Sequence, residues 1–145
     1  MDFFTALDIA ASGLSAQRTN MNVISMNLAN VKTTRTAEGG PYQRKIVLFR
    51  SAPIEWPPKK VWQTELEREV KGVKVAMILT DKRPFRRVYD PDHPDADKDG
   101  YVLYPNINVV EEMANLLTAL RTYEANLSCV SSIKDMINEA LQIGR

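Results

Sequence analysis

The sequence predicts an α+β fold in which two long terminal helices pair as a coiled coil on either side of a small antiparallel β insertion. Three observations indicate this fold class. Apolar residues recur at helical spacing near both ends, all eight prolines lie between those ends, and the middle contains short β-favouring runs. We expect residues 1–31 and 106–145 to form a helical domain and residues 32–105 to form the β-rich insertion with its loops.

The first helix is expected over residues 3–30. Apolar side chains form a near-heptad seam along it, typical of a helix packed on another helix: Leu7, Ala10, Leu14, Met21, Ile24 and Leu28. Asp2 is the expected N-cap, because its carboxylate can accept hydrogen bonds from the first turn. Asn30 is the expected stop, because Asn tolerates the left-handed conformation at a helix end.

This first helix carries little charge. Asp8 and Arg18 are its only charged side chains between residues 3 and 30, although 26% of the whole chain is charged. A face of small polar residues suits contact with other protein better than contact with water, and it predicts assembly. The expected assembly surface is Ser12, Gly13, Ser15, Thr19, Asn22, Asn27, Ala29 and Asn30. Helix capping is the alternative role for Asn30.

The last helix is expected to begin after Pro105, with Asn108 as its N-cap, and to end at Gly144. Its apolar residues recur at spacings of three and four: Met113, Leu116, Leu117, Leu120, Tyr123, Leu127, Val130, Ile133, Ile137 and Leu141. Two long helices with such seams most simply pair with each other, antiparallel or nearly so.

The middle of the chain predicts a small antiparallel sheet. Residues 42–49, 61–66, 73–80 and 85–89 are β-favouring runs separated by turn residues. These runs do not predict the register between the strands.

One loop has the pattern of the first half of a calcium-binding loop, with Asp95, Asp97 and Asp99 at alternate positions before Gly100. The twelfth position holds Asn106 instead of the bidentate Glu, and the prolines before the loop are incompatible with an entering helix. A solvated acidic turn is therefore the favoured interpretation, with a weak cation site as the alternative, and no metal or cofactor is predicted.

Composition and motifs exclude several function classes. A net charge of +1 gives no electrostatic footprint for nucleic acid, and no run of 18 apolar residues predicts a membrane span. The opening Met-Asp-Phe-Phe lacks the features of a cleaved Sec signal. His93 is the only histidine, and no nucleophilic triad, phosphate loop or cysteine cluster accompanies it. We expect a protein that is not an enzyme.

Several motifs follow one another along the chain. They are ALDIAASGLSAQR at 6–18, NLANVKTT at 27–34, Gly40-Pro41-Tyr42, the stretch 93–113, and RTYEAN at 121–126. In this order they resemble the bacterial flagellar basal-body rod proteins of the FlgC type, subunits of the proximal rod. The resemblance runs through nearly the whole length of the chain.

The resemblance implies a structural role in motility. It implies a subunit that leaves the cell through the flagellar type III export apparatus without a cleaved signal. Such a subunit would assemble with itself and with other rod proteins in the periplasm. The resulting helical tube would transmit motor torque and let export substrates pass. The alternative from the residues alone is a cytosolic coiled-coil adaptor whose β module binds a peptide or a cation, and an enzyme acting through His93 is a more distant one.

Overall fold

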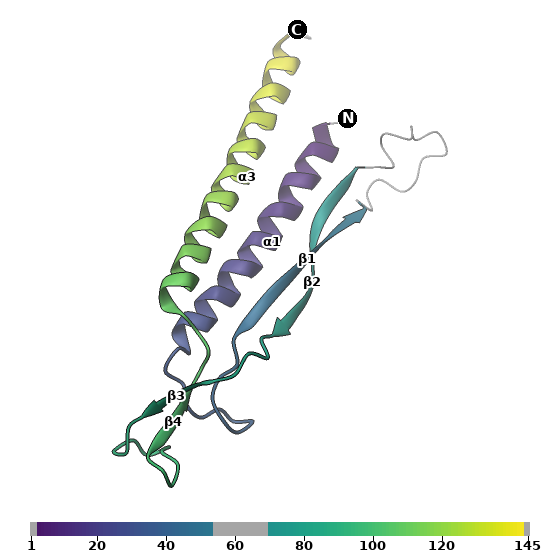
Figure 1. The fold of residues 1–145 in the computed structure, drawn as a ribbon. Coiled ribbons are helices and arrows are strands. Elements are labelled where there is room, and N and C mark those ends of the chain that lie inside the picture. Colours follow the sequence, from purple (N-terminus) through teal and green to yellow (C-terminus); the bar gives the residue numbers. More distant parts are fainter. Residues whose placement is uncertain (1–2, 54–69, 144–145) are drawn as a thin grey trace.

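The computed structural model describes residues 3–53 and 70–143. Two long helices, α1 (Phe3–Ala29) and α3 (Val109–Ile143), run antiparallel along an elongated molecule (Figure 1). The predicted α+β fold, with paired terminal helices and an antiparallel β insertion between them, is confirmed. None of the described helices combines the length and apolarity that crossing a membrane requires.

Two contacts set the register of the helix pair. The amide of Asn27 meets the carboxylate of Glu112, and Gly13 faces the side chain of Asn126. The first pair and the second are 14 residues apart on both helices, from 13 to 27 and from 112 to 126. Because 14 residues are two heptads, the helices keep a constant coiled-coil register between these contacts.

On α3 the seam that faces α1 is regular. Its less exposed residues recur at spacings of four and three: Glu112, Leu116, Ala119, Tyr123, Asn126, Val130, Ile133 and Ile137. The other residues of α3 are exposed. Five residues of the predicted seam, Met113, Leu117, Leu120, Leu127 and Leu141, are therefore exposed instead of packed on α1, and that part of the prediction was wrong.

On α1 the predicted seam was right at Ala10 and Ile24, which are buried, and wrong at its larger residues. The helix contacts α3 on one side and the β1–β2 hairpin on another, so its burial does not follow a single stripe. Its most buried residues are small or polar: Ala10, Ala16, Val23, Ile24 and Asn27. The predicted seam residues Leu14, Met21 and Leu28 are only half-buried.

The hairpin of β1 (Lys45–Pro53) and β2 (Lys71–Thr80) lies along α1 (Figure 1). Its antiparallel register runs from Lys45 opposite Thr80 to Pro53 opposite Lys71, with an irregularity after Leu48. The strands extend the predicted runs 42–49 and 73–80 toward the hairpin's far end. The predicted run 61–66 lies outside the described residues.

A second hairpin, of β3 (Arg86–Tyr89) and β4 (Tyr101–Tyr104), lies at the end of the molecule where α1 stops and α3 starts (Figure 1). The rings of Tyr89 and Tyr101 meet edge to face at 5.2 Å. The run 85–89 was predicted, whereas β4 was not.

The helix ends confirm one predicted cap and correct another. Asn108 caps α3, because its Oδ1 accepts a hydrogen bond from Val110 N at 3.0 Å. Asn30 does not take the left-handed conformation, since the described non-glycine residues all have negative φ. Instead its Nδ2 donates to Met26 O at 2.8 Å, a carbonyl in the last turn of α1 that also accepts a hydrogen bond from Asn30 N at 3.1 Å. Asp2 and Gly144 lie outside the described residues.

Candidate assembly site

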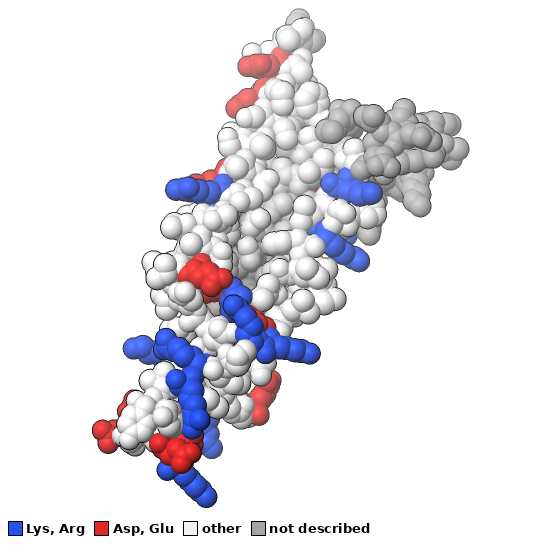
Figure 2. All heavy atoms as spheres, viewed as in Figure 1, with Lys and Arg blue, Asp and Glu red and all other residues white. Residues whose placement is uncertain are grey.

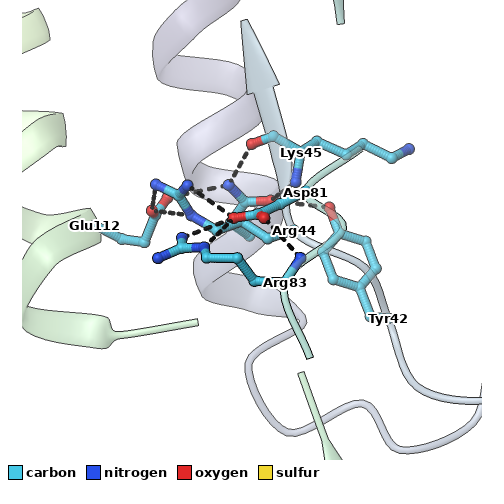
Figure 3. Close-up of polar contacts among 7 residues, drawn as sticks. Tyr42, Arg44, Lys45, Asp81, Arg83 and Glu112 are labelled. Carbon is cyan, nitrogen blue, oxygen red and sulfur yellow. Dashed lines mark hydrogen bonds and ion pairs between the residues drawn. The ribbon is translucent and has the colours of Figure 1, made fainter. Parts of the chain in front are cut away.

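Four elements meet in a cluster of polar side chains that we call the junction (Figure 3). It lies where α1 ends, β1 begins, β2 ends and α3 begins. Its members are Asn27, Tyr42, Arg44, Lys45, Asp81, Arg83 and Glu112. The junction fixes the helix pair to both strands of the first hairpin.

Glu112 is the most deeply buried charge of the junction, with 1% of its surface exposed. Its Oε1 accepts hydrogen bonds from Arg44 Nε at 2.8 Å and from Arg44 Nη2 at 2.5 Å. Its Oε2 accepts one from Asn27 Nδ2 at 3.0 Å. A buried carboxylate with both oxygens satisfied is tolerated, whereas removal of its cationic partner leaves an uncompensated charge in the protein interior.

Asn27 holds the first residue of β1 against the end of α1. Its Nδ2 donates to Lys45 O at 2.9 Å, and its Oδ1 accepts from Lys45 N at 2.9 Å and from the Tyr42 hydroxyl at 3.2 Å. Burial, and secondarily the nearby charge of Glu112, raises the pKa of Tyr42, so its hydroxyl stays a donor. Only 1% of the surface of Asn27 is exposed, so its polar atoms bind partners within the subunit and are not available to a neighbouring one.

Asp81 completes the junction at the end of β2. Its Oδ2 accepts from Arg83 Nε at 2.8 Å and its Oδ1 from Arg83 N at 3.0 Å, while Arg44 Nη1 lies 3.5 Å from Oδ2. The hydrogen bonds from Arg83, led by the side-chain bond, lower the pKa of the Asp81 carboxyl from 3.8 to about 2. Asp81 therefore stays charged through the neutral and mildly acidic range.

Sequence reasoning did not find the junction, although one signal was available. Glu112 lies four residues before Leu116 and seven before Ala119, so it occupies a position of the α3 seam. A carboxylate within an apolar stripe indicates a buried, paired charge.

The eight residues of the predicted assembly surface do not form one face. Three contact other elements of the chain: Asn27 in the junction, Gly13 against α3, and Ser12, whose Oγ accepts a hydrogen bond from Val73 N of β2 at 3.0 Å. The others are exposed or half-buried: Ser15, Thr19, Asn22, Ala29 and Asn30. Part of the low charge of α1 is thus explained by its position between α3 and the hairpin.

An apolar stripe of α3, most of which was predicted to pack on α1, is instead exposed in the subunit. We call it the outer seam of α3: Val110, Met113, Leu117, Leu120 and Leu127. These residues recur at spacings of three, four, three and seven, and each of the last four lies one position after a residue of the seam that faces α1, which we call the inner seam. One residue turns a helix by about 100°, so the outer seam faces a second direction. An exposed apolar stripe of this kind is typical of a protein interface.

The carboxylates of the acidic loop accept hydrogen bonds from different groups of the same chain. Asp95 accepts a hydrogen bond from Thr34 Oγ1 at 2.7 Å, and Asp97 Oδ1 accepts from the backbone N–H groups of Asp99 and Tyr101. The bond from Tyr101 is the main cause of a lowered pKa at Asp97. Within residues 3–53 and 70–143, no group of three or more acidic, His or Cys side chains could hold a metal ion.

Two protein-family models match this chain. The model described as "Flagella basal body rod protein" matches residues 7–35, and the one described as "Flagellar basal body rod FlgEFG protein C-terminal" matches residues 98–143. The matched segments contain α1 and α3 almost entirely, so the family pattern coincides with the helix pair.

Curated relatives match over the full length. The chain is 44% identical to the flagellar basal-body rod protein FlgC of Borreliella burgdorferi, over 99% of this chain and 98% of the relative. It is 39% identical to that of Bacillus subtilis and 36% identical to that of Salmonella typhimurium, over 100% of both chains in each case. The chain belongs to the family of flagellar basal-body rod proteins of the FlgC type.

Proposed function

We propose that this chain builds part of the proximal rod as a repeating element of a helical tube that transmits motor torque and lets export substrates pass. As a member of its family the chain is a structural subunit of the flagellar basal body, is not an enzyme, and assembles with other rod components. The relatives give no support to the alternative of a cytosolic adaptor. We also propose that the subunit lies in the periplasm and that the flagellar type III export apparatus delivers it there.

The outer seam of α3 carries this proposal. In a helical lattice each subunit needs complementary surfaces for neighbours in several directions. The α3 helix uses its inner seam for α1 of the same chain, and the outer seam offers Leu117, 57% exposed, and its neighbours to another subunit. A helix with two apolar seams can pack against two other helices at once. Repeating this contact from subunit to subunit would build the wall of a tube.

The division of the chain supports a radial arrangement of the subunit in the tube. We assign residues 1–31 and 106–145 to the wall of the tube and the insertion 32–105 to positions further out. On α1, the exposed residues Ser15, Asn22 and Ala29 add a small-residue surface beside the helix pair. Small side chains there would allow a neighbouring backbone to approach closely.

Basal-body purification tests the proposal. We expect the wild-type chain to co-purify with other rod subunits in detergent-extracted basal bodies, and a Leu117→Asp variant to be expressed but absent from them. Lys98→Glu, a charge change on the exposed acidic loop, is the control that should assemble normally. Recovery of the wild-type chain only in the cytosol would contradict the proposed function, and normal incorporation of Leu117→Asp would contradict the assigned surface.

A further inference from the structure

We propose that the β1–β2 hairpin binds the surface of an anionic lipid bilayer. Binding of this kind is peripheral, goes beyond the proposed rod function, and is a property of the isolated subunit. It requires an exposed apolar surface, positive charge beside that surface, and a position in the fold that leaves the rest of the subunit clear of the lipid.

The apolar part of the hairpin surface consists of two cross-strand pairs. Ile46 lies opposite Leu79, and Leu48 lies opposite Met77. Residues two apart on a strand point to the same face, and residues directly opposite each other have Cβ atoms about 4.5–5.5 Å apart. The four side chains therefore form one continuous patch. Their exposed fractions lie between 40% and 51%, so each has apolar surface left to bury.

A pair of basic residues continues the same face of the hairpin. Arg50 follows Ile46 and Leu48 on that side of β1, and its partner across the hairpin is Lys74. Like charges directly opposite each other destabilise a pair of strands, so a negatively charged group placed over this pair lowers the energy of the hairpin. We call the six residues together the hairpin face: Ile46, Leu48, Arg50, Lys74, Met77 and Leu79.

The hairpin as a whole is basic. The two strands contain Lys45, Arg50, Lys71 and Lys74, and neither strand contains an acidic residue. Within the described chain, Arg50 and Lys71 form no ion pair with a carboxylate. Figure 2 shows basic groups on the hairpin side of the molecule and acidic groups near the C-terminal end of α3. The hairpin therefore attracts anions, although the net charge of the chain is only +1.

A lipid surface with anionic headgroups matches both parts of the hairpin face. Its phosphate groups lie directly above the acyl chains, so apolar side chains can enter the acyl boundary while Lys and Arg keep their charged ends among the headgroups. Amphipathic helices with basic polar faces bind membrane surfaces in this way, and their affinity depends on buried apolar area and on attraction to anionic lipids. Each Lys or Arg near such a surface strengthens binding about fivefold.

The position of the hairpin in the fold is compatible with this contact. The α1 helix packs against α3 on one side and against the hairpin on another (Figure 1). The hairpin face and the outer seam of α3 therefore belong to elements that α1 separates. A subunit held on lipid through its hairpin can keep the outer seam of α3 available to another subunit.

Co-sedimentation of the purified chain with vesicles tests the role of charge. We expect binding to vesicles of phosphatidylglycerol mixed with phosphatidylcholine and little binding to phosphatidylcholine alone. The chain should dissociate at about 1 M salt, where the screening length falls to about 3 Å. Arg50→Gln with Lys74→Gln should weaken binding about 25-fold. Arg18→Gln with Lys98→Gln removes two exposed cations that lie outside the hairpin and should leave binding unchanged.

A second pair of variants tests the apolar patch, with circular dichroism to confirm that each variant is folded. Leu48→Gln with Met77→Gln should weaken binding to the anionic vesicles. The matched control, Leu117→Gln with Leu120→Gln on the outer seam of α3, should bind as the wild type does.

Three results with vesicles would overturn the proposal: no binding of the wild-type chain to anionic vesicles, equal binding to both kinds of vesicle, or full binding by the folded hairpin variants. Sedimentation velocity without vesicles tests the other occupant of the hairpin face, a second copy of the chain. Self-association that the hairpin variants abolish would show that a second copy covers this face and would overturn lipid binding, whereas a monomer is the expected result.

Discussion

Replacing Arg44 with Met should destabilise the subunit strongly, because the change leaves a buried carboxylate without its cation. Glu112 is 1% exposed, and Arg44 supplies both hydrogen bonds to its Oε1. Breaking one side of a buried ion pair costs about 3–5 kcal/mol, which lowers the folding equilibrium constant by about 10² to 10⁴. The contact of Arg44 with Asp81 adds little to this loss, because Arg83 holds the same carboxylate at shorter distances.

Urea unfolding of the purified chain, followed by circular dichroism, measures the effect. The double variant Arg44→Met/Glu112→Leu should recover much of the loss, since it removes the charge and leaves only one donor of Asn27 without a partner, at about 1–3 kcal/mol. Arg18→Met is the matched control: this side chain is exposed on α1, and substitutions of exposed side chains usually change stability by less than about 0.5 kcal/mol. A loss below about 1 kcal/mol for Arg44→Met, or a double variant as unstable as the single one, would refute this reasoning.

Three further outcomes follow from the structure. Gly13→Glu should lower the stability of the isolated chain, by about 1–3 kcal/mol for an overpacked contact, because a Cβ there would lie 3.1 Å from Asn126 Nδ2; wild-type urea stability would contradict the packing. The free energy of unfolding should fall as pH drops from about 4 to about 2, since the unfolded state binds the proton at the ordinary pKa of 3.8 and the folded Asp81 only at about 2; Asp81→Asn should flatten this acid limb, and an unchanged limb would count against the assignment. Leu117→Asp should abolish swimming in soft agar while changing stability by less than about 0.5 kcal/mol; a large loss of stability would place this residue in the subunit core instead.

The sequence was sufficient to predict the helices, most strands and the antiparallel pairing, because these depend on spacing and on local turn chemistry. It was not sufficient to predict which stripe of α3 faces α1. Leucines occupy both seams of that helix, so apolar periodicity supports either face. On α1 the residues at the contact are as small as Gly13 and Ala16, and the larger leucines beside them dominated the pattern without marking the packed side.

The junction lay beyond sequence reasoning for a different reason. Asn27 and Glu112 are separated by 85 residues, and Arg44 and Asp81 stand beside strand ends where charged residues are common. A single sequence gives no sign that such distant polar side chains share one site. Only the position of Glu112 within the inner seam indicated a buried charge.

The antiparallel helix pair places both ends of the described chain at the same end of the molecule, opposite the β3–β4 hairpin (Figure 1). A force that pulls these ends apart therefore loads the helices in an unzipping direction and breaks their contacts one turn at a time. The early turns resist little, since small residues such as Ala10 and Gly13 hold them. Resistance increases further where the opening meets Val23 and Ile24, and it is greatest at the Asn27–Glu112 contact, about 36 Å along a 27-residue helix from its first residue. Mechanically, the subunit is a pair of helices held together most strongly at the end next to the β3–β4 hairpin.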